Sequence, residues 1–290
     1  MIFSAIVPFL NEERYLEECI KALLGQDFDK NKYELIFVDN GSEDRSKDIV
    51  RKYPRIILLE EPRKSSYAAR NKGLGMAKGQ IIAFTDADCA VSPDWLTCIY
   101  EGVTKNEATI ALGKRSFPQK CSALLHFYED YDNAKTEYVL NNCPKEYLYG
   151  FTNNMAARSD VFKRIGKFTE LARGGDTEFV HRCMSNIPGA KIVYLSTMKI
   201  THLEIKNTNA WLKKHISYGE HNARLEKISG YKKLNYRTKI RICLYCARRN
   251  KYTFLQNVFF LFTLALGDLC YNIGILKGRI KSPYNAKDLF

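Results

Sequence analysis

Short apolar, β-rich runs alternate with helical patterns through the first hundred residues, and this alternation constrains the fold more than any other feature. The runs SAIVPF, YELIFVDN, RIILLE and IIAFTDAD have the length and composition of buried strands. Between them lie segments with a helical spacing of apolar residues, such as the one from about Ser66 to Lys78. Strands that alternate with helices of about ten residues predict an α/β domain, with a mostly parallel sheet and helices on both faces.

Acidic side chains follow two of the expected strands. Asp39 ends one strand, and Asp86 and Asp88 end another, directly after the apolar run IIAFT. Ligands of parallel sheets bind beyond the carboxyl ends of the strands, so these carboxylates are expected near one crevice. Asp86 and Asp88 have the spacing to hold a divalent ion, Mg²⁺ or Mn²⁺, and a diphosphate, with a solvated acidic turn as the alternative. Asp39 either closes an Asx-turn or accepts a hydrogen bond from a nucleotide base or ribose.

Three further residues are candidates for chemistry or binding. Asp176, in the sequence GGDTEF at the start of an expected helix, is either a helix cap or a general base that deprotonates an acceptor hydroxyl. His202 follows an expected strand and is either structural or a third metal ligand beside Asp88. Arg70 precedes the strand of the acidic pair, and it either binds a phosphate or belongs to a solvated helix face.

These motifs, in this order and spacing, resemble those of the family 2 glycosyltransferases, which have the GT-A fold. The matching segments cover roughly residues 1–205, and they are IVPFLNEE, VDNGSEDRS, AARNKGLGMAKGQIIAFTDAD, GFTNNMAARSDVFKRIGKF and GGDTEF. The resemblance implies an enzyme that transfers a sugar from a nucleotide-diphosphate donor, usually a UDP-sugar, with inversion and with the help of a divalent metal, Mn²⁺ or Mg²⁺.

The resemblance also implies roles for individual residues. The implied nucleotide-binding residues are Pro8, Asn11, Glu12, Asp39, Arg70 and Asp86. The implied metal ligands are Asp88 and His202, and the implied catalytic base is Asp176. Gly175 stands where the motif commonly has Glu, so an acceptor contact by that Glu is not carried over. No Q-x-x-R-W motif follows the base, so we expect transfer of a single sugar and not polymer synthesis.

The basic residues are concentrated late in the chain. Of the net charge of +13, the segment from Lys213 to Lys251 carries +10, with twelve Lys or Arg residues and two Glu residues. Residues 254–276 then form an apolar run with one charge, Asp268. The run is long enough to span a bilayer, but an Asp at mid-membrane costs about 2.5–3.5 kcal/mol, which favours helices that lie at the interface. The expected partner is an anionic membrane surface on its cytoplasmic side, and the alternative is a helical pair that packs on the catalytic domain or forms a homodimer contact.

Two segments are therefore expected. Residues 1–210 form a GT-A catalytic domain, with a nucleotide-binding half over about 1–115 and an acceptor-side half over about 116–210, and residues 211–290 form a basic helical and apolar appendage. The N-terminal sequence MIFSAIVPFLNEE has no basic region before a short apolar stretch, which is typical of a first strand and not of a signal peptide. The nine scattered cysteines favour free thiols in a reducing compartment. We expect a cytoplasmic enzyme, peripheral at the membrane, that acts on a glycan or lipid-linked acceptor.

Other classes of function fit less well. A non-catalytic nucleotide- or glycan-binding module, or an assembly scaffold, would have no need to keep Asp39, Asp86, Asp88 and Asp176 together. Nucleic acid is not expected as a partner, because the aromatic residues in the basic segment are not accompanied by a recognised nucleic-acid motif. A nucleotidyltransferase would want a Gly-rich basic loop after the first strand, where this chain has the sequence NEE.

Overall fold

The computed structural model describes residues 1–171, 173–205, 207–229 and 231–280, without the side chains of 221–229, 279 and 280. This part of the chain divides into two compact units. Unit 1 comprises Met1–Arg115 and Gly150–Glu204 and contains the sheet. Unit 2 comprises Ser116–Tyr149 and the chain from Ile205 onward and is helical.

The first four strands of unit 1 form the parallel part of the sheet. They are β1 (Phe3–Phe9), β2 (Tyr33–Asp39), β3 (Ile56–Glu60) and β4 (Ile81–Thr85). β1 lies between β2 and β4, and β3 pairs with the other edge of β2. β1 and β4 are buried along their whole length, as expected for parallel strands that are covered by helices on both faces.

Four further strands make the sheet mixed. They are β5 (Cys89–Val91), β6 (Ile110–Ser116), β7 (Asn154–Arg158) and β8 (Ile192–His202). The strand order is β3-β2-β1-β4-β7-β6-β8-β5. β7 is antiparallel to both β4 and β6, and β5 is antiparallel to β8. The predicted α/β fold is confirmed, and its parallel character belongs to the half of the sheet made by β1 to β4.

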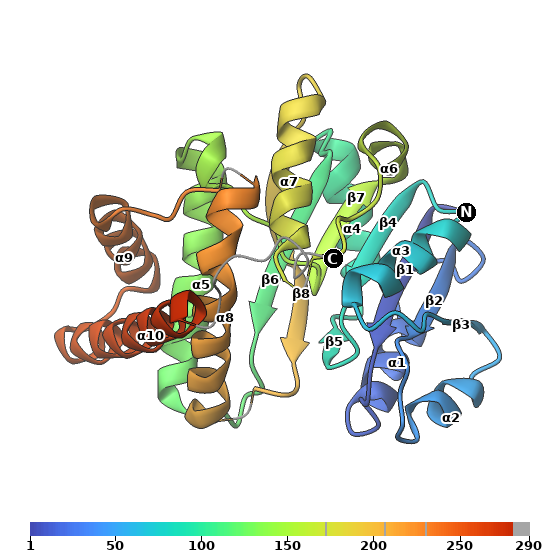
Figure 1. Cartoon of the computed structure of the whole chain (residues 1–290), viewed down its shortest axis with the longest axis horizontal. Coiled ribbons are helices and arrows are strands. Elements are labelled where there is room, and N and C mark those ends of the chain that lie inside the picture. Colours follow the sequence, from blue (N-terminus) through green and yellow to red (C-terminus); the bar gives the residue numbers. More distant parts are fainter. Residues whose placement is uncertain (172, 206, 230, 281–290) are drawn as a thin grey trace. The chain divides into compact units, whose positions relative to one another are not determined.

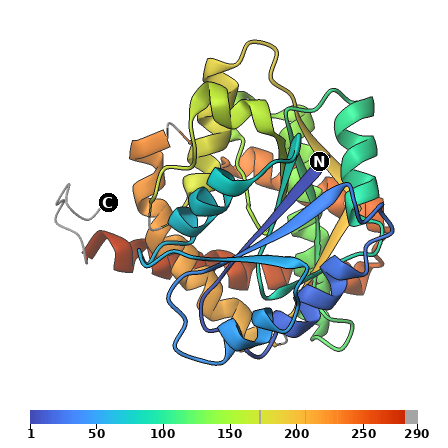
Figure 2. The same ribbon diagram turned by 90° about the vertical axis from the view of Figure 1, so that its right-hand side faces the viewer.

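Helices cover both faces of this sheet (Figures 1 and 2). They are α1 (Leu16–Leu24), α2 (Ser46–Arg51), α3 (Ser66–Met76), α4 (Trp95–Lys105), α6 (Ser159–Ile165) and α7 (Gly175–Asn186). Side chains alternate along β1, so Phe3, Ala5 and Val7 pack in one core with α1 and α4. Ile6 points to the other face, where α3 approaches so closely that a Cβ on Gly73 would lie 2.6 Å from the Ile6 side chain.

Aromatic rings hold α6 and α7 to the same face as α3. Phe84 of β4 lies beside Ile6 in the sheet register and therefore shares its face. The ring of Phe162 in α6 lies against Phe84, and the ring of Phe179 in α7 stacks on Phe162. The start of α7 is thus fixed over the end of β4, where the acidic pair begins.

Unit 2 is built from helices that share small aromatic clusters. They are α5 (Ala123–Asn142), the 3₁₀ turn η1 (Lys145–Tyr147), α8 (Thr208–Ser229), α9 (Tyr236–Asn250) and α10 (Phe254–Ile280). Leu125 of α5 packs with Trp211 of α8. Ala134 of α5 packs with Cys246 of α9 and Phe260 of α10.

The two units divide the chain differently from the segments expected from the sequence. Residues 116–149, expected in the acceptor-side half of a domain over 1–210, group with α8, α9 and α10. The apolar pattern of α5 gave little indication of this packing, because three of its six buried residues are polar: Asp132, Asn133 and Thr136. Lys135 neutralises the buried Asp132 at 2.9 Å, which allows a charge inside a helical core.

Candidate active site

Asp39 is a buried carboxylate at the carboxyl end of β2, with 1% of its surface exposed. Its Oδ1 accepts a hydrogen bond from the backbone N–H of Ser42 at 3.0 Å, so the turn interpretation of the sequence is present in the structure. Its Oδ2 lies 3.3 Å from Nζ of Lys47 in α2. Asp39 therefore forms an ion pair with Lys47 at the end of the strand.

The loop after β1 is held against the loop after β2. Asn11 has a left-handed backbone (φ 55°), and its Oδ1 accepts a hydrogen bond from the N–H of Glu43 at 2.8 Å. The N–H of Glu12 donates a hydrogen bond to the hydroxyl of Ser46, the first residue of α2, at 2.8 Å. Pro8 is buried within β1. The sequence candidates Pro8, Asn11, Glu12 and Asp39 thus lie along the same edge of the sheet, beyond or near the ends of β1 and β2.

The two acids after β4 have different partners. Asp86 is partly exposed, and its Oδ1 accepts a hydrogen bond from a terminal guanidinium nitrogen of Arg70 at 2.5 Å. Arg70 lies in α3 and is 3% exposed, which contradicts a solvated helix face. Asp88 is 8% exposed, so it is not a solvated turn, and its Oδ2 lies 3.4 Å from Nε2 of His202. The pairing of β5 with β8 sets Cys89 opposite His202 and brings His202 to the acid pair.

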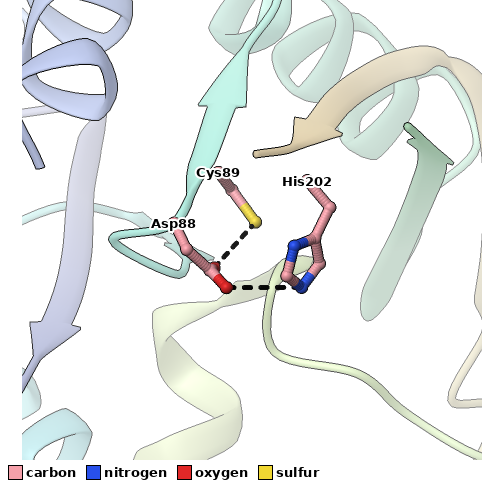
Figure 3. Close-up of side chains that lie close together, drawn as sticks. All are labelled: Asp88, Cys89 and His202. Carbon is pink, nitrogen blue, oxygen red and sulfur yellow. Dashed lines mark hydrogen bonds and ion pairs between the residues drawn. The ribbon is translucent and has the colours of Figure 1, made fainter. Parts of the chain in front are cut away.

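Asp88, Cys89 and His202 form a buried cluster whose potential ligand atoms all lie within 4.8 Å of one another (Figure 3). The Cys89 thiol donates to Oδ1 of Asp88 at 3.4 Å, and burial raises the pKa of that thiol well above its ordinary value. Sequence reasoning missed Cys89, because it treated the nine cysteines only as free thiols. The available signal was its place directly after the acidic pair.

The donor atoms of this cluster fit a divalent transition metal. The carboxylate oxygen of Asp88 and the imidazole nitrogen of His202 are 3.4 Å apart. Neighbouring ligands of one octahedral ion lie about 3 Å apart when each is about 2.1 Å from the metal. An imidazole ligand favours a transition metal over Mg²⁺, which prefers oxygen ligands. Asp88 and His202 are therefore the described residues best placed to hold such an ion.

Asp176 lies in the first turn of α7, where two backbone groups fix its carboxylate. One oxygen accepts a hydrogen bond from the N–H of Thr177 at 2.9 Å, and the other accepts from the N–H of Thr152 at 3.3 Å. Burial raises the pKa of Asp176 above its ordinary value, although these hydrogen bonds and the nearby Arg70 act in the opposite direction. A carboxylate with a raised pKa is a stronger base, and Asp176 therefore has the electrostatic property that a general base needs.

The Gly in front of Asp176 has a steric cause. A Cβ at Gly175 would lie 2.7 Å from the carbonyl oxygen of Thr169 and 3.1 Å from the ring of Tyr67. A larger side chain at this position would require the Thr169 backbone to shift and would crowd the Tyr67 ring. The departure of this chain from the common motif, with Gly175 in place of Glu, therefore fits the close approach of Thr169 and Tyr67.

Tyr67 connects the two parts of the candidate site. Its hydroxyl accepts a hydrogen bond from the backbone N–H of Asp176 at 3.3 Å, and the guanidinium of Arg70 lies 5.6 Å from the centre of its ring. A continuous path of contacts therefore runs from Asp86 through Arg70 and Tyr67 to Asp176. Sequence reasoning missed Tyr67, although its spacing of three residues from Arg70 on one helix was a usable signal.

Comparison with known proteins places these motifs in a family. The family described as Glycosyl transferase family 2 matches residues 4–166, which is more than half of the chain. Glycosyltransferase AglE of Haloferax volcanii is 32% identical over 187 residues, which are 62% of this chain and 60% of that protein. The poly(ribitol-phosphate) beta-N-acetylglucosaminyltransferase TarS of Staphylococcus aureus is 35% identical over 101 residues, which are 33% of this chain and 18% of that protein. The chain thus matches less than two thirds of the length of either relative.

Solved structures share the fold at low sequence identity. TarS 1–349 of S. aureus in complex with UDP-GlcNAc has a TM-score of 0.57 and 19% identity, and the match covers 98% of this chain and 93% of that chain. The mannosyltransferase PcManGT from Pyrobaculum calidifontis in complex with GDP-Man and Mn²⁺ has a TM-score of 0.61 and 17% identity, with 98% and 81% covered. The predicted GT-A fold is confirmed by this likeness.

Proposed function

The chain belongs to glycosyl transferase family 2 and is a glycosyltransferase, and from this premise we propose the reaction that it performs. It moves a single sugar from a nucleotide-diphosphate donor, a UDP-sugar, to a hydroxyl of a glycan or lipid-linked acceptor. The configuration at the anomeric carbon inverts, and Asp176 is the general base. The donor side uses the strand ends of unit 1, with a divalent metal held by Asp88 and His202.

One observation carries this proposal: the path of contacts that joins Asp86 to Asp176 through Arg70 and Tyr67. A transferase must hold its base and the leaving diphosphate in a fixed relation, because misplacement by about 1 Å is enough to lose much of the rate. A helix cap and an acidic turn would need no such connection. The buried α3 residues therefore support a site in which Asp176 and the acid pair act together.

The proposed chemistry needs one protein base. Asp176 takes the proton of the acceptor hydroxyl while that oxygen bonds to the anomeric carbon. The bond from this carbon to the diphosphate oxygen breaks on the opposite face, and the electron pair leaves with the diphosphate, so the configuration inverts. Arg70, which is buried and pairs with Asp86, is proposed to bind the developing negative charge. A nucleoside diphosphate is a good leaving group, and so no protein acid is required.

The nucleotide is proposed to bind beyond the ends of β1 and β2, in contact with Pro8, Asn11 and Glu12, with Asp39 as an acceptor for the base. UDP is preferred because the TarS neighbour is a complex with UDP-GlcNAc. GDP is the competing nucleotide because the PcManGT neighbour is a complex with GDP-Man.

The metal is proposed to be Mn²⁺ or Mg²⁺, with Mn²⁺ preferred because one of its ligands is an imidazole. When bound, a divalent ion would offset the charge that builds on the departing diphosphate. The Mn²⁺ of the PcManGT complex supports this choice.

We also propose that residues 211–290 attach the enzyme peripherally to an anionic membrane on its cytoplasmic side. The net charge of +10 between Lys213 and Lys251 supports this attachment. Among the described residues, α10 is the one helix long and apolar enough to cross a membrane, over Phe254–Gly278. Only 33% of its most apolar stretch is buried, whereas a core helix of a soluble protein is mostly buried.

Product analysis tests the proposed reaction. The purified chain is incubated with Mn²⁺ and a panel of UDP- and GDP-sugars, with glycan and lipid-linked acceptors, and the released nucleoside diphosphate is measured. NMR of the product should show the anomeric configuration opposite to that of the donor. Nucleotide binding with no release for any acceptor would favour the alternative, a non-catalytic binding module or scaffold. A product that retains the donor configuration would contradict the role of Asp176.

A further inference from the structure

Helix α10 of unit 2 exposes large apolar side chains along one face. The buried residues Phe260, Thr263 and Cys270 define the opposite face at helical spacing. The large apolar side chains of α10 that are at least 49% exposed are Phe254, Leu255, Phe259, Leu261, Phe262, Leu269 and Leu276. We call these seven residues the α10 apolar face. A patch of this kind on a water-soluble surface is unfavourable unless something covers it.

Helix α9 carries a basic face. It contains five Lys or Arg residues and no acid. Arg237, Arg241 and Arg248 are exposed at helical spacing, beside the exposed Ile240 (59%) and Leu244 (51%). Among the side chains that the structure describes, these three Arg residues form no ion pair. A helix face that combines Arg with aliphatic side chains is typical of helices at the interface of an anionic membrane.

The one acid of α10 is neutralised by α9. Oδ2 of Asp268 lies 2.8 Å from Nζ of Lys239, and both side chains are partly exposed. This ion pair joins α9 to α10, which lie beside each other within unit 2 (Figure 1). In the sequence, Asp268 argues against a membrane contact by residues 254–276. In the structure, Lys239 of α9 neutralises this carboxylate where the two helices meet.

The contacts of α10 argue against a helix that crosses the bilayer. Helix α8 lies so close along it that a Cβ on Gly219 or Gly274 would collide with backbone atoms of the partner helix. α8 exposes Lys213, and α5, which packs on Phe260, contains the Asp132–Lys135 pair. A spanning α10 would carry these charges into the hydrocarbon region, which is strongly unfavourable.

We propose that the α10 apolar face and the basic face of α9 form a membrane-docking surface that lies in the plane of an anionic bilayer. The apolar side chains enter the acyl region, and the Arg side chains reach the lipid phosphates. This inference specifies the membrane attachment proposed above and rests on it. A bilayer provides a counter-charge for Arg237, Arg241 and Arg248 and an apolar medium for α10, whereas a second copy of this surface would bring cations against cations.

Vesicle co-sedimentation of the full chain tests the docking surface. The wild type should bind vesicles of phosphatidylcholine with phosphatidylglycerol, and bind phosphatidylcholine alone much more weakly. The double variant Phe259→Glu with Phe262→Glu should lower the partition coefficient at least about 100-fold, since each Phe contributes about a tenfold factor. Arg237→Ala with Arg241→Ala should lower it about 25-fold, since each cation near an anionic surface contributes about a fivefold factor.

A matched control and a wash distinguish the outcomes. Tyr100→Glu changes an aromatic residue of α4 that is 41% exposed, and it should leave the partition coefficient unchanged. Cell membranes that contain the wild type are then washed with alkaline carbonate, which should release a helix lying in the plane. Retention after this wash would show a spanning helix and overturn the inference.

Two further measurements keep the result interpretable. The wild type could instead bind no anionic vesicle and form a dimer that Phe259→Glu with Phe262→Glu converts to a monomer. This result would show that the α10 apolar face is a contact between copies, and it would also overturn the inference. Thermal shift with nucleotide and Mn²⁺ is measured on every variant. Nucleotide binding without vesicle binding would reject the docking surface alone, and vesicle binding without nucleotide binding would reject the donor site alone.

Discussion

Replacing Asp176 by Asn should remove the proposed base and leave the donor site in place. Asn has the same shape, and its one oxygen can still accept the hydrogen bond from the N–H of Thr177. Its amide group would face the N–H of Thr152 in place of the second carboxylate oxygen. A lost hydrogen bond to a buried donor costs about 1–3 kcal/mol.

The stability effect of this substitution is small because two effects oppose each other. Burial raises the pKa of Asp176 above its value in the unfolded chain, so ionisation of this carboxyl works against folding at neutral pH. Asn removes that penalty while it loses the bond from Thr152. We therefore expect the Tm to shift by less than about 5 °C. The loss of a general base should lower kcat about 10²–10⁴-fold.

Steady-state kinetics and nucleotide titration on the same preparation check this expectation. The variant should bind the donor nucleotide with unchanged Kd while kcat falls. Asp160→Asn, in the first turn of α6, is the matched control, because Asp160 also begins a helix and pairs with Arg158 at the surface. It should leave kcat within about twofold of the wild type, since surface pairs contribute little. If Asp176→Asn keeps a kcat within about threefold of the wild type, the assignment of the base is wrong.

Three further expectations follow, two from the contacts of Asp176 and one from the packing of β6. The kcat should fall as the pH falls through the pKa of Asp176. Because burial raises that pKa, the acid limb of the pH profile should lie above the ordinary pKa of 3.8. An acid limb at or below pH 3.8 would contradict the role of Asp176 as the base. Tyr67→Phe removes the hydroxyl that accepts a hydrogen bond from the backbone N–H of Asp176 but keeps the ring. The kcat should therefore fall about 3–10-fold with an unchanged KM for the donor. A KM that rises by the same factor as kcat falls would indicate a merely structural role. Gly113→Ala would place a Cβ against the side chain of Asn154 and the Met198 carbonyl, so chemical denaturation should show a loss of about 1–3 kcal/mol, and no loss would mean that β6 relaxes freely.

The parallel half of the fold was predictable because its signals are local. β1, β2 and β4 are continuous apolar runs that end in turn residues, and the helices between them have clear spacing. The pairing of β5 with β8 joins Cys89 to His202 across more than a hundred residues, and no local pattern reports such a pairing. The sequence also did not predict that α5 belongs to the helical unit, because half of the buried residues of α5 are polar.

The candidate site shows the same division. Asp39, Asp86, Asp88 and Asp176 stand at strand ends or helix starts, where a carboxylate is conspicuous in the sequence. Tyr67 is an ordinary aromatic residue within a helix, and its contact with Asp176 bridges 109 positions of sequence, so only the fold reveals it. Its effect on Gly175 also depends on that distant contact.

Nucleotide-dependent stabilisation tests the central claim most directly: that unit 1 holds a metal-assisted nucleotide-sugar site at Asp88. Thermal unfolding is measured with UDP and with GDP, each with and without Mn²⁺, on the wild type, on Asp88→Ala and on Asp48→Ala, whose carboxylate on α2 is 69% exposed. At a hundred times Kd, a bound nucleotide should stabilise the fold by about 2.7 kcal/mol. We predict a Mn²⁺-dependent shift with one nucleotide in the wild type and in Asp48→Ala, and its loss in Asp88→Ala. No shift with either nucleotide, or a shift that Asp88→Ala retains in full, would contradict this prediction.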